Sequence, residues 1–466
     1  MDLKPREKGK AFPQALPLKS LLGPSFILLG LGLGSGELIL WPYLSSQFGL
    51  GIIWAAVLGI TFQFFLNMEI ARYTLVTGES VFVGLARKLG RFSPLWFIFS
   101  TFIPWIWPGI IAASATVLAT LIGVKYTPIL PILMLILIGI ILTLGPVLYK
   151  TQESLQKAVI IAGVPFVFIL TFIMSGPADW TSLAQGLVGR GEGFWFLPRA
   201  IPLATLLGAF AYAGAGGNLN LAQSLYVKAK GYGMGKYAGD ITSVITGKKQ
   251  SLRLEGFDFE QNQKNITNFQ TWWKRINTEH LLVFWATGAL TMIILSLLSY
   301  ITVFENATNQ TGINFVIFEG KAISEAISVN IGKLFYAVIC IMLFFTQFSV
   351  FGSTSRIMSE NLVIFSPQKF KKENLSLFFY LTLWLQIIAG VIIFMVGFTE
   401  PLALVILGAV LNAFSMFIYS GLILWLNRTE LPQNTKPAFL RFAVVSIAFL
   451  FYGGFSIFTI WQYLSV

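Results

Sequence analysis

Glu37 is the one charged residue between Lys19 and Glu69, and it directly follows a run of alternating glycines in the stretch GLGLGSGELIL. A carboxyl group in so apolar a segment can bind a cation or carry a proton. An ionised carboxylate at bilayer depth costs on the order of several kcal/mol unless it is paired, protonated or hydrated, so intramembrane acids are usually functional. We therefore predict a functional role for Glu37, with a structural carboxyl group facing neighbouring helices as the alternative.

A second glycine-rich segment lies in the other half of the chain and precedes Asn218, Asn220 and Gln223. The glycines of the two segments are Gly30, Gly32, Gly34, Gly36, Gly208, Gly214, Gly216 and Gly217. Each glycine costs roughly 1 kcal/mol in a helix interior relative to alanine, so their concentration needs an explanation. Close helix packing through small residues is one. The other, which we predict, is a pair of broken helices at corresponding positions of two inverted repeats, as in many transporters.

The composition indicates a protein with many membrane spans. Of 466 residues, 56% are hydrophobic and 11% charged, and the mean hydropathy is +0.75. A bilayer core of ~30 Å needs about 20 apolar residues per helix. Residues 20–68 are long enough for two spans, and further uncharged runs cover 92–124, 126–149, 158–178, 200–227, 281–304, 334–355, 374–399, 401–427 and 442–466. We predict eleven transmembrane helices.

The positive charge follows the predicted topology. The chain has a formal net charge of +12 and a single cysteine, which excludes an intramolecular disulfide. With a cytoplasmic amino terminus and an external carboxyl terminus, most Lys and Arg residues fall in internal connections, as expected of membrane proteins. The charge therefore gives no indication of a nucleic-acid partner, and lipid is the expected surrounding.

The predicted fold class is all-α: a five-plus-five inverted repeat with broken helices 1 and 6 and one extra C-terminal helix. The segments are a cytoplasmic tail at 1–20, helices 1–5 at 21–178, helices 6–10 at 199–427 and helix 11 at 438–466.

The long connection 228–280 interrupts the second repeat. It lacks the apolar periodicity of an independent domain, so we predict a solvated cytoplasmic loop. Trp272, Trp273, Lys274 and Arg275 would anchor its end at the membrane interface, where tryptophans and basic residues concentrate. A regulatory or partner-binding insert is the alternative.

Four stretches carry a resemblance to a known family: LGPSFILLGLGLGSGELILWPYLSSQFG, ARYTLVTGES, GGNLNLAQSLYVK and FFTQFSVFGSTSRIMSEN. Together they resemble the first, second, sixth and eighth helices of the Nramp metal-ion transporters, within the amino acid–polyamine–organocation superfamily. The resemblance implies a secondary transporter in the plasma membrane of a prokaryote, working by alternating access. It implies no cofactor, and we expect a monomer.

The metal-binding motifs of that family do not carry over. Its Asp-Pro-Gly-Asn stretch falls on 34–37 and its Met-Pro-His stretch on 215–217, so the soft thioether and imidazole ligands are lost. Oxygen ligands suit Mg²⁺ and Mn²⁺ better than Fe²⁺. We name Glu37 and Asn218 as candidate metal ligands. The family's acidic pair falls on Trp107 and Ile110, and the single histidine, His280, lies at a membrane edge, so proton coupling is doubtful.

The predicted substrate site lies mid-membrane between the two glycine-rich segments. Its residues are Gly34, Ser35, Gly36, Glu37, Ala215, Gly216, Gly217, Asn218, Asn220 and Gln223. Polar residues in later spans that line a cavity or join helices are Gln347, Ser349, Ser353 and Asn412. We predict a divalent cation as substrate.

The alternative substrate is a small organic solute such as an amino acid. The sequence LGSGEL also resembles the Gly-Ser-Gly turn of amino-acid permeases, whose backbone amides receive a substrate carboxylate. Glycines would let such a solute approach the backbone closely.

The sequence does not indicate an enzyme. It has no phosphate-binding Walker loop, no cysteine cluster and no histidine pair. A channel and a non-transporting scaffold or sensor are the remaining alternatives.

Overall fold

The computed structural model describes residues 3–21, 23–144, 148–238, 253–304 and 312–464. The described part is helical apart from two short pairs of strands. Part of the predicted 228–280 loop, residues 239–252, lies outside the described residues.

Nine helical stretches in the described ranges are long and apolar enough to cross a membrane. They are Pro24–Phe48, Leu50–Thr77, Phe92–Ile122, Gln152–Met174, Gln263–Phe304, Val329–Phe365, Lys372–Met395, Pro401–Glu430 and Phe439–Trp461. The shorter apolar helix α7 (Ile129–Leu144) and an interrupted pair, α10 (Leu203–Ala211) and α11 (Ala222–Ala229), are additional. The all-α membrane class is confirmed, and the count of eleven crossings stays a prediction.

The predicted break in the sixth apolar segment is present. α10 ends at Ala211, the chain turns through Gly216 and Gly217 at φ +77° and +51°, and α11 begins at Ala222. Residues with a side chain rarely adopt these positive φ values, whereas glycine does so readily. A short 3₁₀ turn over Gly217–Leu219 joins the halves. The glycine-rich sequence therefore interrupts the helical hydrogen bonds here.

The prediction of a broken first helix is wrong. α1 (Pro24–Gly32) continues through a π-helical segment (Leu33–Leu40) into α2 (Trp41–Phe48) without interruption. A π-helix replaces the usual bonds by wider i→i+5 bonds, and such segments are frequent at functional sites. Glycines in the first helix thus allow a wider turn and close contacts, but the backbone remains hydrogen-bonded along the chain.

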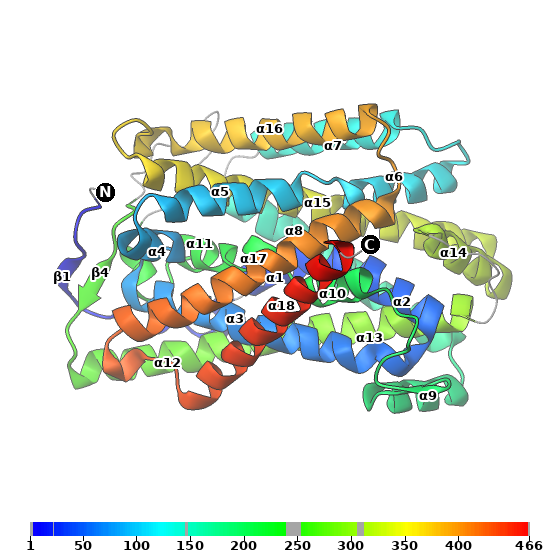
Figure 1. Cartoon of the computed structure of the whole chain (residues 1–466), viewed down its shortest axis with the longest axis horizontal. Helices are drawn as coiled ribbons and strands as arrows, with labels where there is room; N and C mark the ends of the chain where they lie inside the picture. Colours follow the sequence, from blue (N-terminus) through cyan, green and yellow to red (C-terminus); the bar gives the residue numbers. More distant parts are fainter. Residues whose placement is uncertain (1–2, 22, 145–147, 239–252, 305–311, 465–466) are drawn as a thin grey trace.

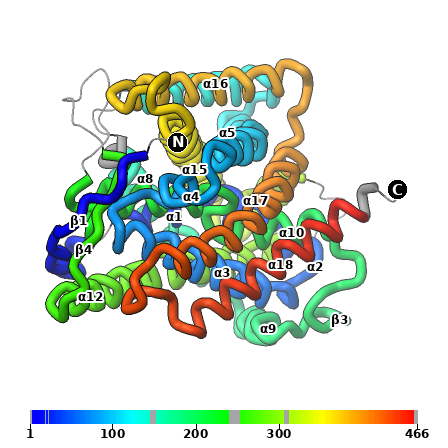
Figure 2. Tube along the Cα trace, turned by 60° about the vertical axis from the view of Figure 1, so that its left-hand side comes forward, coloured from blue at the N-terminus to red at the C-terminus, as the bar shows by residue number. Residues whose placement is uncertain are grey.

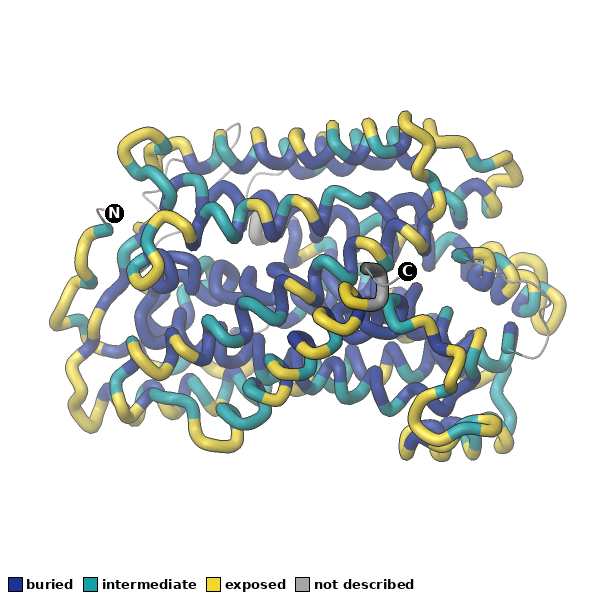
Figure 3. The backbone as a smooth tube through the Cα atoms, in the orientation of Figure 1, coloured by how far each residue is buried: buried dark blue, intermediate teal, exposed yellow. Residues whose placement is uncertain are grey.

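The central helices form the buried core, and other helices form the edges. The long helix α15 (Val329–Phe365) packs against α5 (Phe92–Trp105), α6 (Gly109–Ile122) and α16 (Leu375–Met395). α16 and α7 lie side by side at one edge in both views (Figures 1 and 2). Exposed residues follow the outer helices, whereas the interior is buried throughout (Figure 3).

Six further long helices complete the described bundle. They are α3 (Ile53–Thr77), α8 (Leu148–Met174), α12 (Gln263–His280), α13 (Thr287–Ser299), α17 (Pro401–Glu430) and α18 (Phe439–Leu464). Short helices at the two ends are α4 (Val81–Leu89), α9 (Pro177–Leu187) and α14 (Asn314–Ala326). A small hairpin pairs β2 (Arg190–Gly191) with β3 (Phe194–Trp195).

The described part of the 228–280 segment is ordered and packed, which corrects the expectation of a solvated loop. β4 (Phe257–Phe259) pairs with β1 (Glu7–Lys10) of the amino-terminal segment, next to α12 (Figure 1). Trp272 is buried and donates its Nε1–H to the Pro13 carbonyl at 3.0 Å. Arg72 lies 3.8 Å above the Trp273 ring. These tryptophans hold the amino-terminal segment and a neighbouring helix, and their place at the membrane interface stays a prediction.

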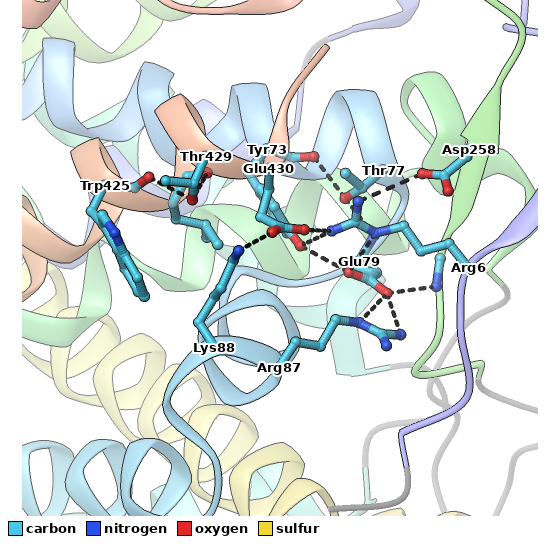
Figure 4. A network of polar contacts seen from close by, with 12 residues as sticks. Arg6, Tyr73, Thr77, Glu79, Arg87, Lys88, Asp258, Trp425, Thr429 and Glu430 are labelled. Atoms are coloured by element: carbon cyan, nitrogen blue, oxygen red, sulfur yellow. Dashed lines mark hydrogen bonds and ion pairs between the residues drawn. The ribbon is translucent and has the colours of Figure 1, made fainter.

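An ion-pair network fastens this amino-terminal end of the bundle (Figure 4). The buried carboxylate of Glu79 accepts from Arg6 at 3.1 Å, from Arg87 at 2.7 Å and from the Tyr73 hydroxyl at 2.8 Å. Glu430, at the end of α17, pairs with the same Arg6 at 3.2 Å. Burial alone would raise the pKa of Glu79, but the two guanidinium groups hold it below its ordinary value. The network joins the amino-terminal segment to the ends of α3 and α17.

Candidate functional site

The π-helical segment of helix 1 packs directly on the break between α10 and α11. A Cβ on Gly36 would lie 1.7 Å from the Tyr212 carbonyl oxygen, and one on Gly32 would lie 2.6 Å from the Gly214 carbonyl oxygen. The two glycines are one helical turn apart, so they present one bare face to the break. Close packing, the alternative for the glycine-rich pattern, therefore explains this part of helix 1.

We expect Gly36→Ala to destabilise the protein by about 3 kcal/mol, because the added methyl group overlaps a backbone carbonyl that cannot rotate away. The measurement is the thermal unfolding midpoint of the purified protein in detergent. Gly454→Ala is the control, since a Cβ there meets nothing within 4 Å. Equal midpoints for the two variants would contradict the close contact.

The side chain of Gln63, in the middle of α3, forms hydrogen bonds with backbone groups of the break between α10 and α11. Its Nε2 donates to the carbonyl oxygens of Phe210 at 3.3 Å and Ala211 at 3.0 Å, and its Oε1 accepts from the Gly216 N–H at 3.2 Å. The Ala211 carbonyl and the Gly216 N–H have lost their helical partners, and a buried unpaired polar group is costly. The Phe210 carbonyl also accepts from the Ala213 N–H at 3.3 Å. Sequence analysis missed Gln63. The available signal was a single amide inside an apolar span.

Asparagines around the break share one bonding pattern: the amide nitrogen donates a hydrogen bond, and the amide oxygen has no partner among the described residues. Asn218 Nδ2 donates to the hydroxyls of Ser100 and Thr101 at 2.8 and 2.9 Å. The Nδ2 atoms of Asn220 and Asn412 donate to the hydroxyls of Tyr419 and Tyr212, respectively, at 2.7 and 2.9 Å.

The oxygens of these amides have no hydrogen-bond donor in the described ranges. The same holds for Gln223 Oε1. Asn412 Oδ1 lies over Gly217, 1.8 Å from where a Cβ would be. The break is therefore rich in buried acceptors and poor in donors, and each unsatisfied acceptor costs about 1–3 kcal/mol.

The Glu37 carboxyl group is fully buried and faces α13. Its Oε1 lies 3.3 Å from the position of a Cβ on Gly288, next to Ile60 and Leu29 side chains. Neither carboxylate oxygen has a hydrogen-bond partner among the residues described. Asn218 instead faces α5, so the two candidate metal ligands contact different elements. The described residues contain no group of three or more His, Cys, Asp and Glu side chains suited to a metal.

The other predicted substrate-site residues are all buried. Gly34 abuts Thr346 of α15, whose hydroxyl donates to the Gly30 carbonyl at 3.1 Å. Ser35 Oγ has no partner within the described part of the chain. Ala215, Gly216 and Gly217 form the turn of the break.

The secondary polar residues divide into two groups. Asn412 belongs to the break, as described above. Ser349 Oγ accepts from Gln156, and Ser353 Oγ accepts from Gln152 at 3.1 Å and bonds the Tyr226 hydroxyl, so these serines join α15 to α8 and α11. Gln347 is buried in α15. Gln152 and Gln156, spaced by one turn in α8, are the sequence feature that could have indicated this contact between α8 and α15.

Comparisons with known proteins bear on the fold. No family model and no curated protein matches the chain. A solved structure of a manganese transporter variant from Eremococcus coleocola superposes with a TM-score of 0.71 at 12% identity, covering 97% of this chain and 89% of that one. Mhp1, a nucleobase-cation-symport-1 family transporter with bromovinylhydantoin bound, gives 0.52 at 12% identity, with coverages of 97% and 94%. The chain has the LeuT transporter fold.

In LeuT-fold transporters, substrates bind near the bilayer midplane, where discontinuous helices expose backbone groups. α10 and α11 form such a discontinuous helix here. The asparagine cluster and the contact with helix 1 both lie at this break.

Proposed function

We propose that the protein is a secondary active transporter that moves a divalent cation, Mg²⁺ or Mn²⁺, by alternating access. The cation would bind at the break between α10 and α11. Its ligands would be the amide oxygens of Asn218, Asn220 and Asn412, carbonyl oxygens of the break, and the Glu37 carboxylate after the helices separate.

The observation that carries the proposal is the excess of free acceptors at the break. Amide nitrogens are committed to hydroxyl groups, which orients the oxygens away from donors. An anion would require donors at this place, whereas a hard cation requires oxygen atoms. Amides supply no soft ligand, so Fe²⁺ gains no preference over Mg²⁺ or Mn²⁺.

The close contact between helix 1 and the break favours an ion over an organic solute. Gly32 and Gly36 approach the carbonyl groups of Gly214 and Tyr212, respectively, too closely for an organic solute to lie between helix 1 and the break. The network around Glu79 closes the amino-terminal end. This is the arrangement expected of a closed transporter state, in which the network must open before a passenger leaves on that side.

Binding can be tested by isothermal titration calorimetry of the purified protein with Mn²⁺ and with Mg²⁺. We expect saturable binding to the wild type, weakened about tenfold in Asn218→Leu through the loss of ~1.4 kcal/mol. Asn361→Leu is the matched control, because Asn361 in α15 is also buried with a free Oδ1 but lies away from the break. Absence of wild-type binding, or equal affinity in Asn218→Leu, would refute the assignment.

A further inference from the structure

A buried cluster of Ser25, Glu279 and His280 lies where helix 1 begins. The Ser25 hydroxyl donates to Glu279 Oε2 at 2.5 Å and lies 2.8 Å from His280 Nδ1. All three residues are buried. His280 Nε2 has no hydrogen-bond partner in the described part of the chain. Two titratable side chains therefore share one hydroxyl group inside the protein.

We propose that Ser25, Glu279 and His280 form a proton-binding relay that couples protons to transport. The inference rests on the proposed transporter function and adds a coupling ion to it. The proton on His280 Nδ1 passes to Ser25 Oγ, while the Ser25 hydroxyl proton passes to Glu279 Oε2, the oxygen to which Ser25 donates. One N–H bond breaks and one carboxyl O–H bond forms, the serine regains its O–H bond, and the imidazolium and carboxylate become a neutral pair.

The surroundings of the relay suit an exchange between these two forms. The His280 ring stacks between Phe64 at 5.6 Å and Phe284 at 4.6 Å, and aromatic faces stabilise a cation. Glu279 also faces the backbone N–H of Gly23 at the start of α1, where a negative charge is favoured. A carboxylate that only capped α1 would not need a histidine bonded to the same hydroxyl group. The Ser25 hydroxyl, shared by Glu279 and His280, therefore distinguishes a proton relay from a helix cap.

Charged groups from the packed neighbours also act on the cluster. Lys157 of α8 and Lys230 beyond α11 act on Glu279, and Arg441 of α18 acts on His280. The phenol of Tyr232 lies close enough to Glu279 to interact electrostatically. The charges of the two lysines and of Arg441 therefore reach both titratable members of the cluster.

The relay is connected to the candidate substrate site through two elements. Ser25 belongs to α1, which continues into the π-helical segment against the break. Phe284, stacked on His280, reaches the break directly, with its Cζ 2.8 Å from the position of a Cβ on Gly214. Movement of helix 1 away from α12 would separate Ser25 from both titratable groups. Proton transfer and opening of the site are therefore mechanically linked.

The transport test uses proteoliposomes loaded with a pH-sensitive dye, with Mn²⁺ added outside. We expect proton movement with Mn²⁺ in the wild type and in Ser25→Thr, which keeps the hydroxyl. In Ser25→Ala the protons moved per Mn²⁺ should fall about tenfold, the size of a typical coupling between sites. The control is Ser45→Ala, since Ser45 of α2 is buried without a partner in the described ranges. Wild-type proton movement in Ser25→Ala would overturn the relay.

A second measurement does not depend on which substrate is transported. The chain has one histidine, so isotope-labelled histidine gives a nitrogen NMR spectrum of His280 alone. We expect the Nδ1 resonance to move in Ser25→Ala and in Glu279→Gln and to stay in place in Ser45→Ala. Unmoved resonances would overturn the relay. Normal NMR results without any Mn²⁺ uptake by the wild type would instead refute the proposed metal transport while retaining the proton site.

Discussion

Glu37→Gln is expected to lower Mn²⁺ uptake into proteoliposomes about 100-fold, equivalent to ~2.7 kcal/mol of lost cation stabilisation. Glutamine keeps the size of the side chain and removes its negative charge. The wild-type carboxyl group has no hydrogen-bond partner in the described structure, so it is available to a passenger once helix 1 separates from α13. Because no described partner is lost, thermal stability should stay at the wild-type level.

Glu319→Gln is the matched control for this prediction. Glu319 is another buried carboxyl group, in α14, away from the break. Its replacement should preserve Mn²⁺ uptake. Wild-type uptake in Glu37→Gln, or an equal loss in both variants, would show that Glu37 has no specific role in transport.

Gln63→Leu is expected to lower the free energy of unfolding by about 2–4 kcal/mol and to abolish uptake. Leucine fills a similar volume but leaves the Gly216 N–H and the Ala211 carbonyl without the bonds that the amide supplies. The turn of the break would then lose its fixed geometry. Chemical denaturation and proteoliposome uptake measure the two effects separately.

Asn67→Leu provides a control on the same helix. Asn67 is fully buried one turn from Gln63, yet neither of its amide atoms has a hydrogen-bond partner in the described part of the chain. Its replacement should leave stability unchanged or raise it slightly, since it removes unsatisfied groups. A similar loss of stability in both variants would mean that α3 tolerates no apolar replacement, and that the bonds of Gln63 to the break are not the cause.

Sequence predicted the membrane class and the break before α11, because uncharged runs and clustered glycines are local properties. It did not distinguish the two glycine-rich segments. Gly216 and Gly217 adopt positive φ, whereas the glycines of helix 1 stay helical and contact the carbonyls of another helix. Glycine permits both outcomes, and the deciding neighbours lie far away in the chain.

The residues of the candidate site can be named from the sequence, whereas their contacts cannot. Glu37 was identified from its isolation in an apolar segment, but its orientation toward Gly288 depends on α13, which only the folded structure brings near. The bonds of Asn218 to Ser100 and Thr101 likewise join distant segments. His280, expected at a membrane edge, is fully buried between two phenyl rings. Charge and hydropathy indicate how deep in the membrane a residue lies, whereas the contacts of its side chain depend on tertiary packing.

Uptake by the purified protein in proteoliposomes tests the central claim most directly. The assay offers Mg²⁺, Mn²⁺, Ca²⁺, Fe²⁺ and a set of neutral amino acids in turn, with and without a pH gradient. We predict saturable uptake of Mn²⁺ or Mg²⁺, driven by the gradient, and none of the amino acids. Saturable uptake of an amino acid without uptake of any divalent metal would contradict the account.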